Sequence, residues 1–246
     1  MDAKRVYETE YAGHAVRYTF RVPGTAALFG DSLKETCGEP DISETEEFFR
    51  LARSLMPHET AEYAEFRSLI CLTSKPLLKH GCCLFHSVAF VYDGLAWLLT
   101  APSGTGKTTQ FLNWERYFPG EIRMISGDVP VVEAAERGLW AHPSPWNGKE
   151  GFRTPGLTAP IGGVVLLEQG DEDRIAPLAP AESIYPLLSQ FIVLLENEEE
   201  VAGLARIADR LLRGVPMMKL VNRGGRPSTE LLRTEINRIA SGRKGT

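Results

Sequence analysis

The residues best placed to do chemistry form one short run, APSGTGKTT at 101–109. The run matches the phosphate-binding loop pattern, with alanine in place of its first glycine. Gly104 and Gly106 tolerate the backbone dihedrals that let consecutive N–H groups curl around a phosphate. Lys107 can then reach the β- and γ-phosphates of ATP, and the Thr108 hydroxyl can bind Mg²⁺. The residues predicted to hold the nucleotide are Ser103, Gly104, Thr105, Gly106, Lys107, Thr108 and Thr109.

A candidate carboxylate follows this run. EIRMIS at 121–126 predicts a short strand that ends at Gly127-Asp128. A carboxylate at a strand end near a phosphate-binding loop commonly anchors Mg²⁺ or accepts the proton of an incoming hydroxyl, so Asp128 is a candidate for both roles. A turn-forming Gly-Asp pair without chemistry is the alternative.

The segment PSPWNGKEG at 143–151 is a third candidate, because it is too rich in Pro and Gly for regular structure. Trp146 and Lys149 displayed on such a loop favour a functional site, since binding residues are often carried on loops. A surface loop without function is the equal alternative.

An apolar hairpin is expected to position the phosphate-binding run. Residues 84–100 read LFHSVAFVY-DG-LAWLLT, and an Asp-Gly step between apolar runs predicts a tight turn. A two-residue loop pairs Phe90 with Trp97 and places His86 opposite Ala101, where the run begins. The strand before the run therefore has an antiparallel neighbour, which predicts an α/β fold with a mixed sheet.

We expect two domains, a small N-terminal α+β subdomain at 1–80 and a P-loop nucleotide-binding domain at 81–246. In the first, alternating apolar residues around Ala12-Gly13 predict a hairpin. Ser43 stands three residues before Glu46, which is the spacing of a helix capping box. The other expected elements are helices over 43–56, 60–73, 180–195 and 198–213, a helix after the phosphate-binding run, a strand at 217–221, and a last helix from near Ser228.

Composition narrows the function classes. The chain has 246 residues and a net charge of −5, which argues against binding to nucleic acid or anionic membranes. Its four cysteines lack CxxC spacing, no apolar signal segment opens the chain, and no stretch is apolar enough to span a membrane, so a cytoplasmic protein is expected. Residues 206–246 carry ten Lys or Arg against three Asp or Glu, either as solvated helix faces or as a surface for an acidic partner.

Residues 80–190 resemble the kinase domain shared by HPr kinase/phosphorylase and ATP-dependent phosphoenolpyruvate carboxykinase, and especially the small bacterial HPr kinase-like proteins. The resemblance is carried, in order, by HSVA at 86–89, DG at 93–94, APSGTGKTT at 101–109 with Trp114, GDVP at 127–130, PWNGK at 145–149 and API at 159–161 before VVLLEQ. It implies a mixed β-sheet flanked by helices, with ATP and Mg²⁺ on the phosphate-binding run.

The resemblance also implies roles for single residues. Asp128 acts on the metal, together with Thr108, or on the substrate hydroxyl. His86 takes the place of the histidine before the hairpin. Lys149, with Arg153 as a second candidate, neutralises the transferring phosphoryl group.

Two departures from the family limit what it implies. The first Asp of the family's acidic pair is Gly127 here. The chain is also far shorter than a carboxykinase and lacks that enzyme's set of His, Lys and Asp residues, so true carboxykinase activity is not expected.

The sequence thus favours an ATP- and Mg²⁺-dependent P-loop kinase that phosphorylates a serine-like hydroxyl on a small protein, peptide or metabolite. The alternative is an ATP-binding regulatory or peptide-biosynthesis accessory protein with little or no turnover. The acceptor stays unnamed, and association into a homo-oligomer is left open.

Overall fold

A computed structural model describes residues 5–148 and 150–244 of the chain. The chain forms two compact units, the first from Met1–Leu84 with Ile192–Leu204 and the second from Phe85–Phe191 with Ala205–Thr246. The sequence placed all of 81–246 in one domain, whereas the segment 192–204 packs with the first unit. Two contacts hold it there, because Leu194 N donates to Ser74 Oγ at 3.1 Å and Lys75 pairs with Glu196 at 2.6 Å.

The first unit contains a four-stranded sheet in the order β3-β1-β2-β4. The expected hairpin joins β1 to β2, with Ala12 and Gly13 at φ values of 51° and 84° in its turn. Tyr18 is buried at its centre, where its hydroxyl bonds Thr73 Oγ1 at 2.9 Å. The elements are β1 (Val6–Tyr11), β2 (His14–Thr19), the 3₁₀ segment η1 (Pro23–Ser32), β3 (Lys34–Thr36), β4 (Ile42–Ser43), α1 (Glu46–Leu55) and α2 (Ala61–Lys79).

Two details of these helices differ from the sequence-based predictions. The side chain that caps α1 is Thr45, which accepts from Phe48 N at 3.2 Å, so the expected cap at Ser43 is wrong. Helix α2 continues through Pro76 to Lys79 instead of ending near residue 73. Leu77 is fully buried just beyond the proline, and its burial offsets the hydrogen bond that a proline cannot donate.

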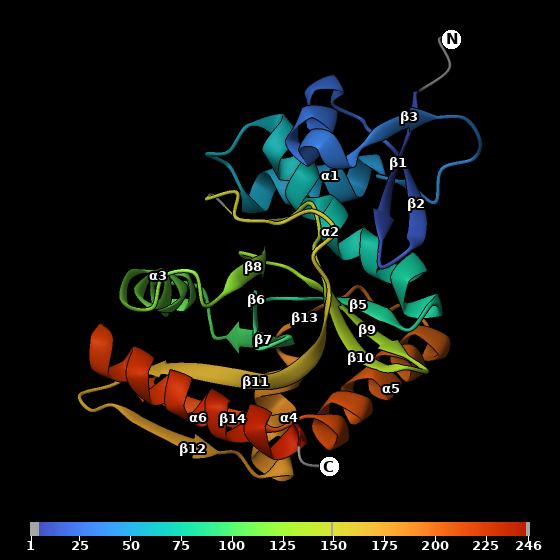
Figure 1. Ribbon diagram of the computed structural model, residues 1–246. Coiled ribbons are helices and arrows are strands. Elements are labelled where there is room, and N and C mark those ends of the chain that lie inside the picture. The colour runs from blue at the N-terminus through green and yellow to red at the C-terminus, as the bar shows by residue number, and fades with distance from the viewer. Residues whose placement is uncertain (1–4, 149, 245–246) are drawn as a thin grey trace. The chain divides into compact units, whose positions relative to one another are not determined.

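The second unit is built on a large mixed sheet, as predicted. Its strands follow the order β9-β10-β11-β7-β6-β8, while β14 also pairs with β11 and β12 with β14. Strands β7, β11 and β14 are parallel, and β6 is antiparallel to both β7 and β8. Figure 1 shows β8, β6, β7, β11, β14 and β12 one after another in this order. The carboxyl ends of the parallel strands therefore share one edge, which is where α/β sheets commonly bind ligands.

The elements of this unit are β6 (Val88–Tyr92), β7 (Leu95–Thr100), α3 (Lys107–Tyr117), β8 (Arg123–Ser126), β9 (Val131–Ala135), β10 (Gly138–His142), β11 (Ala159–Gln169), β12 (Arg174–Pro177), α4 (Pro180–Leu188), β14 (Met217–Asn222) and α6 (Arg226–Lys244). Three elements cross the boundary between the units along the chain: β5 (Cys82–Phe85), β13 (Phe191–Ile192) and α5 (Glu198–Gly214). Helix α4 is shorter than the expected helix over 180–195, since strand β13 follows it.

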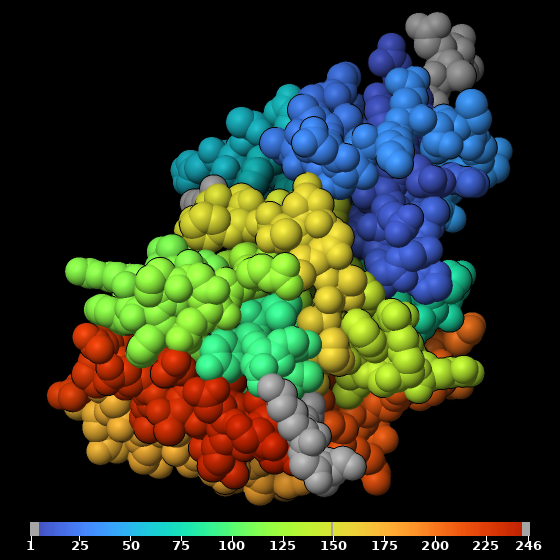
Figure 2. All heavy atoms as spheres, viewed as in Figure 1, coloured from blue at the N-terminus to red at the C-terminus, as the bar shows by residue number. Residues whose placement is uncertain are grey.

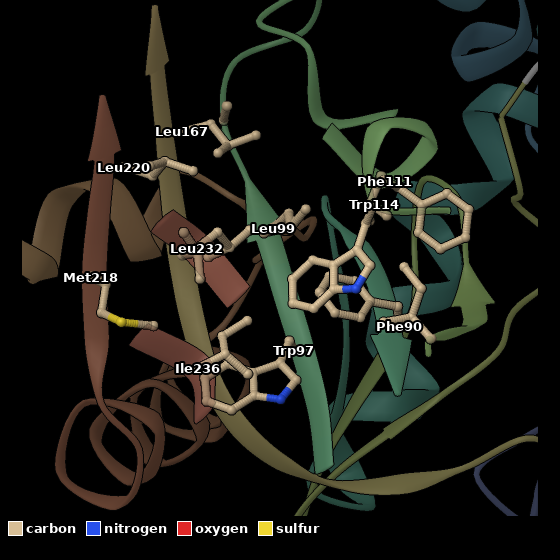
Figure 3. Packing of buried hydrophobic residues seen from close by; sticks show 14 of the residues in the cluster. Phe90, Trp97, Leu99, Phe111, Trp114, Leu167, Met218, Leu220, Leu232 and Ile236 are labelled. Atoms are coloured by element: carbon tan, nitrogen blue, oxygen red, sulfur yellow. The ribbon is translucent and has the colours of Figure 1, made fainter. Parts of the chain in front are cut away.

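The hairpin of β6 and β7 has the predicted register. Phe90 pairs with Trp97, and Asp93 and Gly94 form the turn at φ values of 49° and 77°. Alternate residues of both strands face a core that α3 and α6 complete, and Figure 3 shows Trp97, Trp114 and Phe90 within it. This core holds the strand that leads into the phosphate-binding run.

Helices α3 and α6 pack together on one side of this unit, and Figure 2 shows them adjacent at its surface. Gln110 Nε2 of α3 donates to Thr229 Oγ1 of α6 at 3.3 Å. The Arg233 guanidinium also binds the Glu121 carboxylate at 2.7 Å, just beyond α3. These contacts hold α3 against α6 near the start of α3 and just beyond its end. Across the described residues, no helix combines the length and the apolar composition needed to cross a bilayer.

Candidate functional site

The phosphate-binding run lies between the end of β7 and the start of α3. Gly104 and Gly106 have φ values of 81° and 104°, in the left-handed region where glycine is unstrained. Helix α3 begins at Lys107, so its first N–H groups have no partner within the helix and its positive dipole end faces the loop. The sequence therefore folds into the anion-binding geometry that its motif predicts.

Lys107 is held at the centre of this loop. It is 8% exposed, and its Nζ donates to the carbonyl of Ala101 at 2.9 Å and of Pro102 at 3.5 Å. Burial lowers the pKa of Lys107, while the Asp128 carboxylate acts in the opposite direction. A lysine ammonium has three donors, so a third is left for a phosphate oxygen.

The other predicted loop residues surround this lysine. Ser103, Gly104 and Thr109 are exposed, and Thr108 is half-buried in the first turn of α3. Thr105 is held by its own loop, because its hydroxyl donates to the Pro102 carbonyl at 2.8 Å. The loop thus presents an exposed backbone tip with a buried ammonium behind it.

Asp128 and His86 come together beside the loop. Asp128 follows β8, and its carbonyl accepts from Ser87 N at 2.9 Å. His86 Nε2 lies 3.5 Å from Asp128 Oδ1, with 26% and 23% of the two side chains exposed. The Thr100 hydroxyl donates to the His86 carbonyl at 2.9 Å, which ties the histidine to the last residue before the loop. A carboxylate and an imidazole are thereby held at the same sheet edge as Lys107.

The loop that ends at Gly148 lies against Asp128. Gly148 lies so close that a Cβ built on it would stand 3.3 Å from Asp128 Cβ. Trp146 is 1% exposed, so it anchors the segment in the core, and its expected display on the surface is wrong. The predicted catalytic residue Lys149 falls outside the described residues.

Gly127 occupies a position where any side chain would be crowded. A Cβ built there would lie 3.0 Å from the Asn147 carbonyl oxygen and 3.1 Å from Phe152 Cβ. Gly127 N also donates to the Phe152 carbonyl at 2.8 Å. The close approach of this backbone gives a steric reason for glycine where the resemblance has its first Asp.

Arg153 lies next to this position. Its backbone forms an antiparallel bridge with Ser126, the last residue of β8, and the residue is half-buried.

In the turn after β14, two arginines of the basic C-terminal segment form ion pairs. Arg223 pairs with Asp173, and Arg226 pairs with Glu230.

No protein-family model matches this chain, and no curated protein matches it. Among solved structures, it is similar to the HPr(Ser) kinase/phosphatase from Coxiella burnetii, with a TM-score of 0.40 and 12% identity. The match covers 66% of this chain and 93% of that chain. At this level of similarity we base the function on the chain's own residues.

Two features of the site were not indicated by any pattern in the sequence. Gln169, the last residue of β11, donates from Nε2 to the Thr105 carbonyl at 3.4 Å and so braces the loop. A pocket of about 440 Å³ also opens between this loop, the end of β11 and the end of α4. Neither feature belongs to a motif, since each depends on residues that only the folded sheet brings together.

The donor set suits Mg²⁺ held jointly with a nucleotide. No group of three or more His, Cys, Asp or Glu that could hold a metal ion occurs among the described residues. Mg²⁺ typically takes one or two protein ligands and completes its shell with substrate phosphates and water. Asp128 and the Thr108 hydroxyl are oxygen donors of that kind. In addition, two buried hydroxyls near Asp128 have no hydrogen-bond partner within 5–148 and 150–244, namely Ser87 Oγ and Ser126 Oγ.

Proposed function

We propose that the second unit is an ATP- and Mg²⁺-dependent phosphotransferase of the HPr kinase-like type, acting on a serine-like hydroxyl of a small protein, peptide or metabolite. The observation that carries the proposal is the convergence of a phosphate-binding loop, its buried Lys107 and the Asp128–His86 pair at one sheet edge. Phosphoryl transfer needs mainly positioning and charge neutralisation, and these groups supply both.

Each group has a distinct part in the proposed reaction. The loop N–H groups and Lys107 bind the β- and γ-phosphates and neutralise charge as the bond to the leaving oxygen breaks. Asp128 accepts the proton of the acceptor hydroxyl as its oxygen forms the new bond to phosphorus. His86, 3.5 Å from Asp128 Oδ1, orients that carboxylate. In the alternative role, Asp128 would help the Thr108 hydroxyl hold Mg²⁺, which would neutralise phosphate charge.

The experiment incubates the full chain with Mg²⁺ and γ-labelled ATP, using free serine and seryl peptides as acceptors. Lys107→Ala should lower transfer by at least about 100-fold, because it removes charge stabilisation from the transferring group. Lys75→Ala, a lysine of the first unit, is the matched control and should leave transfer unchanged. Failure of wild-type protein to bind ATP would contradict the proposal.

One observation favours a second candidate function. Gly127 stands in crowded packing where the resemblance has a carboxylate, so fewer groups are available to hold a metal ion. The alternative is a module whose ATP occupancy regulates a partner or assists peptide biosynthesis. Tight ATP binding without transfer to any hydroxyl, and equal hydrolysis by wild type and Asp128→Asn, would favour this alternative.

A further inference from the structure

The pocket beside the phosphate-binding loop is the feature that the proposed chemistry leaves unused. Its volume of about 440 Å³ falls within the range typical of small-ligand sites. Pro102 and Thr105 of the loop form one wall, and Leu166 of β11 forms another. Tyr185 of α4 also lines the pocket, and this side chain is 81% exposed. The pocket therefore connects the loop to an aromatic ring that is open to solvent.

Two contacts place this pocket beside the proposed catalytic pair. Leu166 is level with Thr100 in the parallel register of β11 and β7, and the Thr100 hydroxyl donates to the His86 carbonyl at 2.9 Å. Gln190, which lines the pocket just beyond α4, accepts from His86 N at 2.8 Å through its backbone carbonyl. His86 Nε2 in turn lies 3.5 Å from Asp128 Oδ1. The pocket thus adjoins the groups that would meet the acceptor hydroxyl.

The lining of this pocket suits an uncharged, apolar group. Leu166, Tyr185 and Pro186 supply carbon surface. Glu168 is the one charged side chain among the described residues that line the pocket, and Lys219 pairs with its carboxylate. A charged metabolite enclosed here would lose water without gaining a partner of opposite charge. An aliphatic or aromatic side chain, in contrast, gains stability when it is removed from water.

A second hollow adjoins the first and extends it along the sheet. Its volume is about 390 Å³, and it shares Leu166 and Pro186 with the pocket. It reaches Ala176 of β12 and Val221 of β14. An extended peptide can place side chains in both hollows, whereas a metabolite of a few carbons occupies only one.

We propose that this pocket binds an apolar side chain of a peptide acceptor, close in sequence to the serine that receives the phosphoryl group. The inference rests on the proposed function and names its acceptor class, a peptide in place of free serine. With that side chain held between Leu166 and Tyr185, the seryl oxygen bonds to the γ-phosphorus of ATP as the bond from phosphorus to the ADP oxygen breaks. The hydroxyl proton passes to Asp128.

The test measures phosphoryl transfer from ATP, with Mg²⁺ and the full chain, to a set of nonapeptides. A glycine-rich peptide with one central serine is the reference, and phenylalanine replaces each of its other residues in turn. One of these positions should lower KM about 10-fold relative to the reference, because the ring leaves water on binding. The value of kcat should stay similar.

Variants of Tyr185 test whether the pocket causes this preference. Tyr185→Ala removes one wall, so it should abolish the preference and leave ATP binding unchanged. Tyr185→Phe keeps the ring and should keep the preference. Ile184→Ala, on the same helix but outside the pocket, is the matched control and should behave as wild type. Equal KM values for all peptides in wild type, or an undiminished preference in Tyr185→Ala, would overturn the inference. Weaker ATP binding in Tyr185→Ala with the peptide preference intact would also overturn it and assign the pocket to the nucleobase.

A binding measurement separates this inference from the proposed function. Peptides with alanine in place of the serine cannot receive a phosphoryl group, and their binding, followed by fluorescence polarisation, should show the same preference for phenylalanine. Preferential binding without transfer to any serine would contradict the proposed phosphotransferase and leave the peptide site standing. Transfer without any preference would contradict the peptide site alone.

Discussion

Each unit of this protein contains a carboxylate with little solvent exposure, and the two differ in what surrounds them. Glu65 in the first unit is fully buried and accepts from Arg21 N at 2.5 Å, Val22 N at 2.9 Å and the Thr25 hydroxyl at 2.5 Å. Asp128 in the second unit keeps 23% of its side chain exposed and faces His86. Fixed donors occupy the oxygens of Glu65, whereas Asp128 faces a group that can exchange protons. The kind of group that faces a carboxylate, together with its exposure to solvent, therefore separates a structural carboxylate from a reactive one.

The largest expected effect comes from Asp128→Asn. The amide keeps the size of the side chain but cannot accept a proton, so phosphoryl transfer should fall by about 1,000-fold. The thermal unfolding midpoint should change little, because the amide keeps the size of the carboxylate and the hydrogen bond from Ser87 N goes to the Asp128 backbone carbonyl. Rates measured with labelled ATP, alongside melting curves, check both statements. A large loss of stability in this variant would place Asp128 in the same structural class as Glu65.

Glu65→Gln should produce the reverse pattern. Hydrogen bonds to a charged acceptor are worth about 1.5–3 kcal/mol each, and the amide weakens at least one of them. We expect the free energy of unfolding of the first unit to fall by about 2 kcal/mol, measured by urea denaturation. Nucleotide binding should stay at the wild-type level. Wild-type stability in this variant would show that the three donors do not depend on charge.

The smallest effect concerns Glu44, which accepts from the Ser68 hydroxyl in the first unit. Burial raises the pKa of Glu44 from 4.5 to about 7, although the Ser68 hydrogen bond acts in the opposite direction. The folded chain therefore keeps a proton that the unfolded chain releases. Its stabilising contribution is complete below about pH 4.5 and is lost as the pH rises through about 7.

Glu44→Gln tests this pH dependence. The free energy of unfolding of wild type should decline between about pH 4.5 and 7, and the variant should decline less, since its amide does not titrate. Urea denaturation at several pH values measures both slopes. Parallel slopes would assign the decline to another group.

Local patterns in the sequence predicted much of this site. The phosphate-binding run and the register of the hairpin depend on short spacings, which local rules describe well. The features that the sequence did not reveal depend on tertiary packing. Trp146 lies in a Pro- and Gly-rich segment, and only the fold reveals that its ring is buried. The contact between His86 and Asp128 and the donors around Glu65 likewise join segments that are distant in sequence.

The packing at Gly127 restricts how this protein can change. An aspartate at this position would add a second carboxylate beside Asp128. Its Cβ would stand 3.0 Å from the Asn147 carbonyl oxygen and 3.2 Å from that of Phe152, so the backbone of these two residues would have to shift by a few tenths of an ångström. Gain of the carboxylate is therefore coupled to the loop that lies against Asp128. A substitution that loosens this loop would make the second carboxylate easier to accommodate.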